Sequence, residues 1–198
     1  AFMLRNSTDG IGLNHFDIGA GFGSPARLKS ILAMNGLHKY QNGPDDPDPN
    51  YNDKMTPMDL LGHEFGHSWL AYVYVDSAGS PVPALLGRAY QHWNFFADVD
   101  ASIMEGSSMQ RATVDSFYTD SVSVGYGGPD LYLMGMISKA ETESILVVNN
   151  PVNPLPAGVY VPYSVPFAGF RCHGTATYWH VSDIEAVHGP RVPNSASA

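Results

Sequence analysis

Two histidines four residues apart, with a glutamate directly after the first, are the residues of this sequence best suited to chemistry. They are His63, Glu64 and His67, in the run His-Glu-Phe-Gly-His. On an α-helix, residues four apart lie on one face, so both imidazoles could bind one metal ion while Glu64 reaches a water molecule on that ion. This spacing predicts a zinc hydrolase with Glu64 as general base. The alternative is a pair of core or surface histidines that bind no metal.

A catalytic zinc ion normally has three protein ligands, so a third ligand must lie elsewhere in the chain. The extended pattern HExxHxxGxxH is absent, because the residues after His67 are Ser-Trp-Leu-Ala-Tyr-Val. We rank His92 first, since the aromatic residues around it in positions 90–96 would exclude water from a metal site. A satisfied core histidine is the alternative there. The acidic candidates are Asp130, which we rank second, and Asp98, Asp100 and Glu105.

Two of these acidic candidates have other interpretations. Asp130 could instead accept a hydrogen bond from a ligand histidine, or cap the short helix that follows Pro129. Glu105 lies in a Met-Glu-Gly run that favours a turn. The sequence alone leaves the third ligand open.

A residue that stabilises the oxyanion of an attacked amide is also required. Tyrosine and histidine side chains can donate that hydrogen bond, and we prefer Tyr132 because it lies close to Asp130. The full set of candidates is Tyr126, Tyr132, His173 and His180. We therefore take Tyr132, with Glu64, as the predicted catalytic residues.

The histidine motif should lie within a helix over residues 57–74. Thr56 can act as its N-cap, Pro57 suits the first helical position, and Asp59 stands where a capping box places an acid. Apolar residues at spacings of three and four predict a buried stripe beside the histidine face. These residues are Met58, Leu61, Phe65, Trp69 and Tyr72.

Gly62 and Gly66 each cost up to about 1 kcal/mol in a helix interior. We expect compensation from the close approach of another backbone or of substrate.

The other expected elements are short. Strands are predicted at 10–18, 27–34, 145–148 and 159–165, and helices at 130–136 and 139–144. Residues 27–34 could offer a free edge to an extended peptide. Turns or loops are predicted at 41–54, 76–83 and 149–156, with a frayed tail at 194–198. The run Asp46-x-Asp48-x-Asn50 resembles the start of a calcium loop but lacks its glycine and closing glutamate, so a solvated loop is the preferred interpretation.

Composition narrows the classes of function. The 198 residues, 44% of them hydrophobic, are enough to bury one core. Ten basic against 19 acidic residues give a net charge of −9, which argues against nucleic acid or an anionic membrane as partner. No apolar run approaches the roughly 20 residues of a membrane span. The chain begins at Ala1 without a signal-like segment, so we expect a mature or trimmed product.

Several runs together resemble secreted bacterial zincins, the HExxH zinc metallopeptidases. They are residues 63–69, 85–88, 92–93, 130–135 and 189–193. The pattern of HExxH, a tryptophan and a distant histidine is also similar to SprT-like metalloproteases, whose third ligand is a downstream histidine. The resemblance implies a zincin fold, peptidase activity, and a secreted or extracellular bacterial protein. It implies no particular substrate.

These observations predict an α+β, zincin-like fold with a small twisted sheet, the HExxH helix and a more irregular C-terminal lobe. One catalytic domain should span residues 1–198, with lobes at about 1–75 and 76–193. The expected function is that of a zinc-dependent metalloendopeptidase acting on protein or peptide, with Zn²⁺ held by His63, His67 and His92. The alternatives are a zinc hydrolase of non-protein substrates and a catalytically silent zincin scaffold for binding or adhesion. Oligomeric state is not predicted.

Overall fold

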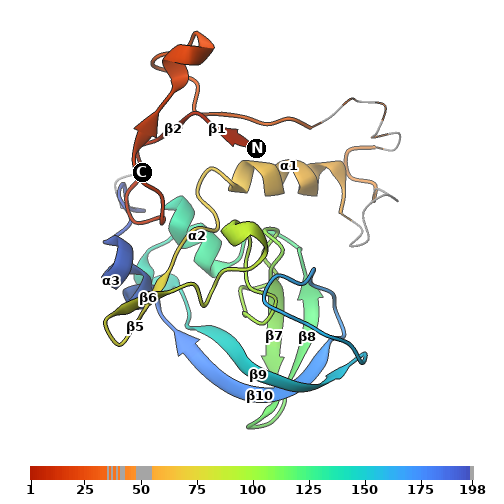
Figure 1. Ribbon diagram of the computed structural model, residues 1–198. Helices are drawn as coiled ribbons and strands as arrows, with labels where there is room; N and C mark the ends of the chain where they lie inside the picture. The colour runs from red at the N-terminus through yellow and green to blue at the C-terminus, as the bar shows by residue number, and fades with distance from the viewer. Residues whose placement is uncertain (35, 37, 39, 41–42, 48–54, 197–198) are drawn as a thin grey trace.

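Helix α1 (Pro57–Gly66) carries the histidine motif and lies between two parts of the molecule (Figure 1). The N-terminal segment, with strands β1 to β4, lies on one side of α1, and a four-stranded sheet lies on the other. The computed structural model describes residues 1–34, 36, 38, 40, 43–47 and 55–196. No helix among these residues has the length and apolar character needed to cross a lipid bilayer.

The described residues form a mixture of helices and short strands. The helices are α1 (Pro57–Gly66), α2 (Gly128–Met134) and α3 (Val181–His188), with 3₁₀ turns η1 (Gly19–Phe22), η3 (Arg88–Tyr90) and η4 (Lys139–Glu141). The short strands are β1 (Phe2–Met3), β2 (Arg5–Asn6), β3 (Phe16–Asp17), β4 (Ser30–Ile31), β5 (Val75–Ser77) and β6 (Ser80–Val82). The longer strands are β7 (Ser107–Arg111), β8 (Ser116–Val122), β9 (Ile145–Leu155) and β10 (Arg171–Trp179).

The longest strands pair in the C-terminal half of the chain. They form an antiparallel sheet in the order β7-β8-β10-β9, in which Cys172 lies opposite Phe117 and Tyr178 lies opposite Leu146. One face of this sheet covers an aromatic core cluster that includes Phe95 and Phe170. The C-terminal half, predicted to be the more irregular part, therefore contains the largest sheet.

Strand β9 corrects one loop prediction. Residues 145–148 are a strand as expected. The strand continues to Leu155 and so includes nearly all of 149–156, which was predicted to be a proline-rich loop. Proline lacks the N–H that a central strand would donate, and it is tolerated here because β9 is an edge strand of the sheet. The pairing with β10 thus overrides the local preference for a loop.

The N-terminal strands are much shorter than predicted. Only Phe16–Asp17 of residues 10–18 and Ser30–Ile31 of residues 27–34 are paired, with β2 and β1 respectively. Most side chains in 27–31 remain exposed, so no buried face favours a longer strand there. Residues 159–165 form a turn and no strand.

Some of the remaining local predictions are confirmed and others are wrong. Helix α2 confirms the prediction over 130–136, while 139–144 contains only the short 3₁₀ turn η4. Of the predicted turn at 76–83, only Ala78 and Gly79, both with positive φ, form the turn, and the residues on either side belong to the paired strands β5 and β6. Residues 197–198 of the predicted tail lie outside the described residues.

The start of α1 matches the prediction and its end does not. The Thr56 hydroxyl accepts a hydrogen bond from the Asp59 N–H, and the Asp59 carboxylate accepts one from the Thr56 N–H. The helix ends at Gly66 and His67 is its C-cap, so the predicted extension to residue 74 is wrong. Residues 72–75, Tyr-Val-Tyr-Val, are aromatic and β-branched and run extended instead, with both valines fully buried.

The predicted buried stripe of α1 is also wrong. Met58 and Phe65 are 49% and 43% exposed, whereas His63 and Gly66 are buried. A Cβ at Gly66 would lie 2.5 Å from the sulfur of Met104, so the glycine face of the helix packs directly on the turn at 102–106. A close approach does occur at Gly62 and Gly66, but the side chains of Ile103 and Met104 make it, whereas the prediction was another backbone or a substrate.

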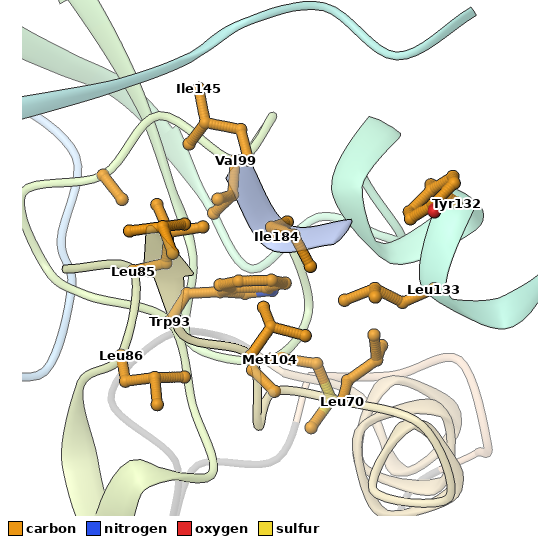
Figure 2. Packing of buried hydrophobic residues seen from close by; sticks show 14 of the residues in the cluster. Leu70, Leu85, Leu86, Trp93, Val99, Met104, Tyr132, Leu133, Ile145 and Ile184 are labelled. Carbon is orange, nitrogen blue, oxygen red and sulfur yellow. The ribbon is translucent and has the colours of Figure 1, made fainter. Parts of the chain in front are cut away.

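The main core cluster lies beneath this turn. Figure 2 shows Trp93 packed among Leu85, Met104 and Ile184, and these four residues come from different segments of the chain. Trp93 directly follows His92, so core packing fixes the backbone from which His92 projects.

Candidate metal centre

Three histidines converge on one point beside α1. The rings of His63, His67 and His92 form a nearly equilateral triangle, with centroids 5.0, 5.0 and 5.1 Å apart. One ligand atom from each lies within 4.8 Å of the others. The Nε2 atoms of His63 and His92 are 3.3 Å apart, which matches the separation of about 3.3 Å for two nitrogens bound tetrahedrally to one zinc ion.

Each imidazole is oriented through its other ring nitrogen. Nδ1 of His63 lies 2.8 Å from the carbonyl oxygen of Ile103, and Nδ1 of His92 lies 2.9 Å from that of Arg88. Nδ1 of His67 lies 3.3 Å from the carbonyl oxygen of Leu70. A ring that donates from Nδ1 presents an unprotonated Nε2 to the centre, the arrangement usual for metal-binding histidines.

Different elements supply these carbonyl groups. His63 lies in α1 and His67 caps it, so the helical spacing of four residues places both rings on one face. The Ile103 carbonyl belongs to the turn at 102–106, which the Ile103 N–H ties to Gly125. Turn η3 provides the Arg88 carbonyl, and His92 follows this turn. The site is thus assembled from segments that are remote in the sequence.

Burial keeps the imidazoles of His67 and His92 neutral. It lowers the pKa of His67 to about 4, with a further contribution from His63 and His92, and it lowers the pKa of His92 as well. Neutral imidazole is the form that binds a metal. The three imidazole donors, their spacing and the neutral forms of His67 and His92 all fit a divalent zinc ion.

Glu64 faces the same cavity. Its carboxylate forms an ion pair with the α-amino group of Ala1. Burial alone would raise the pKa of Glu64, but the hydrogen bond and the charge of this amine lower it, so the side chain is ionised near neutral pH. The cavity has a volume of about 410 Å³, within the range of ordinary ligand sites.

The predicted third ligand His92 is therefore brought to His63 and His67, and the acidic candidates are not. Asp98 accepts a hydrogen bond from the Met109 N–H, and Asp100 accepts one from the Gly128 N–H. Neither carboxylate belongs to the histidine cluster.

Asp130 has a structural role. Its fully buried carboxylate accepts hydrogen bonds from Trp93 Nε1 at 2.8 Å and from the Gly127 N–H at 2.9 Å. It thus caps α2, one of the roles considered from the sequence, and holds the tryptophan that follows His92. Burial raises its pKa to about 6.

Glu105 lies closest to the site among the acidic candidates. It is in a turn as expected, with φ at 59°, and its carboxylate is 3.8 Å from His92 Nε2. Its hydrogen bonds go to the Arg88 guanidinium. Its carboxylate thus lies near His92 and is held in place by the hydrogen bonds from Arg88.

The proposed oxyanion residues lie elsewhere. The Tyr132 hydroxyl donates to Glu185 at 3.0 Å, and Tyr132 does not line the cavity. Tyr126 donates to the Gly62 carbonyl at 2.5 Å. His173 lies on β10, where its ring is close to the Asp115 carboxylate. His180 is the N-cap of α3. The structure does not bring Tyr132 to the histidines, so we no longer assign it a catalytic role.

Three polar residues in the cavity wall were not predicted. They are Tyr72, Arg88 and Gln91. Gln91 immediately precedes His92 and Arg88 lies four residues before it, so the prediction of His92 could itself have indicated them as neighbours of the site. Tyr72 could not have been found in this way, because its place depends on the early end of α1.

The calcium-loop hypothesis concerns Asp48 and Asn50, which lie outside the described residues. Comparisons with protein-family models, curated proteins and solved structures found no match to this chain. Its function must therefore be inferred from the geometry of the histidine site.

Proposed function

We propose that this chain is a zinc-dependent metallopeptidase that hydrolyses peptide bonds in proteins or peptides. The observation that carries the proposal is the convergence of one ring nitrogen from each of three histidines, each on a ring whose Nδ1 lies against a backbone carbonyl. A zincin-like fold, secretion and a bacterial source remain expectations from the sequence resemblance.

The three histidines would hold the ion, and Glu64 would perform the proton transfers. Zinc bound by three imidazoles lowers the pKa of water to about 7 and polarises a carbonyl group. Glu64 is one residue from His63 and ionised, so it can accept the proton of the attacking water and return it to the leaving amine. Burial lowers the pKa values of His67 and His92, so protons compete less with a metal ion for these two rings.

The arrangement supports an active site better than a purely structural zinc site. Structural zinc sites are closed by four protein ligands, whereas catalytic sites combine three with an open position. Among the described residues three histidines form this cluster, and it lies on a cavity of about 410 Å³ with an ionised carboxylate in its wall. This combination is what general-base hydrolysis requires.

Glu64→Gln tests the proposal. The change keeps the shape of the side chain and removes the base, so hydrolysis of denatured casein should fall by about 10²–10⁴-fold while zinc content stays near one ion per chain. Glu143→Gln, at an exposed position, is the matched control and should leave both unchanged. Activity is followed by release of fluorescent peptides, and zinc by elemental analysis.

Three results would contradict all or part of the proposal. One is hydrolysis by Glu64→Gln at the wild-type rate, and another is the absence of zinc after reconstitution. Zinc binding without any cleavage of protein would leave a metal centre but reject the peptidase function.

A further inference from the structure

The cavity wall contains three candidate donors for the carbonyl oxygen of a substrate. The Tyr72 hydroxyl donates its proton to the His67 carbonyl oxygen at 2.7 Å. Gln91 is exposed and neutral. The third donor, Arg88, is a cation whose Nη2 lies 3.2 Å from His92 Nε2, the atom that would bind the metal.

The Arg88 guanidinium is held in place by Glu105. Its Nε lies 3.1 and 3.0 Å from the two carboxylate oxygens, and its Nη2 also contacts this carboxylate. No hydrogen bond to a described residue engages Nη1, so this nitrogen retains its donors. Burial alone would raise the pKa of Glu105, but the hydrogen bond from Arg88 lowers it, so the pair is ionic.

The turn that carries Glu105 also orients His63, and Arg88 itself orients His92. Ile103, two residues earlier, offers its carbonyl to His63, and Arg88 offers its own carbonyl to His92. Glu105 has a left-handed backbone at φ 59°, which is uncommon for a residue other than glycine and costs free energy that the surrounding structure must offset. The guanidinium and two imidazoles are therefore fixed by one connected set of contacts.

We propose that Arg88 is a catalytic residue that donates a hydrogen bond to the scissile carbonyl oxygen, and that Glu105 is its positioning residue. This inference rests on the proposed function. As the oxygen of water bonds to the carbonyl carbon, the π electrons of the carbonyl move onto its oxygen, and Arg88 stabilises that negative charge. The carbonyl then re-forms as the carbon–nitrogen bond breaks, and the amine leaves with the proton carried by Glu64.

The electrostatics of the pair suit this role. A guanidinium without a counter-charge beside His92 would disfavour a bound cation, because like charges repel. The Glu105 carboxylate offsets this repulsion, so Arg88 can lie beside the metal ligands without weakening metal binding. The donors of Nη1 then remain for the oxyanion.

Arg88→Ala and Arg88→Lys test the assignment with a fluorogenic peptide copied from a cleavage site in casein. Removing one preorganised donor should lower kcat of Arg88→Ala by about 10²–10³-fold with little change in KM, because the bond strengthens only in the transition state. Lysine should restore part of the rate, since it keeps the charge and loses the planar geometry. Zinc content and circular dichroism should match the wild type in both variants.

Two further readouts separate a catalytic role from a structural one. Guanidinium ion at millimolar concentration should partly restore the kcat of Arg88→Ala. The affinity of a phosphinic peptide, a tetrahedral anionic mimic of the transition state, should fall in Arg88→Ala by nearly the same factor as kcat/KM. Arg171→Ala, on the exposed start of β10, is the matched control and should behave as wild type.

Glu105→Gln tests the positioning role. It should lower kcat, and the double variant with Arg88→Ala should be no slower than Arg88→Ala alone, because Glu105 acts through Arg88. Additive losses would overturn the positioning role.

The outcomes distinguish this inference from the function on which it rests. If the wild type hydrolyses peptide in a Glu64-dependent way but Arg88→Ala keeps its kcat, the Arg88 assignment is overturned and the peptidase function stands. A large loss of kcat in Tyr72→Phe alone would transfer the role to Tyr72. If the wild type cleaves no peptide, both are overturned.

Discussion

Asparagine in place of Asp130 should make the stability of this protein less dependent on pH. The Asp130 carboxyl is fully buried, and burial raises its pKa from 3.8 to about 6. Hydrogen bonds from Trp93 and Gly127 oppose this effect only in part. The folded protein therefore binds the proton of Asp130 more tightly than the unfolded chain does.

The sign follows from this raised pKa. The stabilising contribution of Asp130 is fully present below pH 3.8 and is lost as the pH rises to about 6. A change of about two pKa units corresponds to about 3 kcal/mol in the free energy of unfolding. Asparagine does not titrate, so relative to wild type the Asp130→Asn protein should gain about 3 kcal/mol between pH 4 and pH 7.

Urea unfolding followed by tryptophan fluorescence measures this difference, because Trp93 is buried and touches Asp130. Both proteins are compared at pH 4 and pH 7 with a chelator present, since metal binding adds its own pH dependence. Asp98, whose burial also raises its pKa to about 6, is common to both proteins and cancels. A difference in stability that does not change with pH would refute the reasoning. Loss of zinc in chelator-free Asp130→Asn would show instead that Asp130 is a ligand.

Two further predictions concern His92 and Thr56. His92→Ala should lower zinc affinity, measured by chelator competition at pH 7, by far more than the roughly 10–100-fold expected for an outer partner, while the exposed His173→Ala should not change it; equal losses in the two variants would reject His92 as a ligand. Thr56→Ala removes the hydroxyl that caps α1 and should lower the free energy of unfolding by about 1 kcal/mol in urea titrations, whereas Thr56→Ser should be nearly neutral; an unchanged midpoint for alanine would contradict the cap assignment.

Features that depend only on near neighbours in the chain could be predicted from the sequence. The cap at Thr56 and the shared face of His63 and His67 follow from the geometry of one helical turn, which does not depend on the rest of the fold. The same holds for α2, whose start is set by Pro129 and Asp130. His92 was preferred for its aromatic surroundings, but its distance from the other histidines could not be calculated from the sequence.

The strand pairing and the packing around α1 need partners that are remote in the chain, so they depend on the tertiary structure. Strands β7, β8 and β10 are stabilised by their pairing, and their sequences gave too little local signal to be predicted. The buried face of α1 is its glycine face, because the turn at 102–106 packs there. That contact brings the Ile103 carbonyl to His63 and places Glu105 beside Arg88. Helical spacing aligned His63 and His67, whereas packing of remote segments brought His92 beside them and oriented His63 through the Ile103 carbonyl.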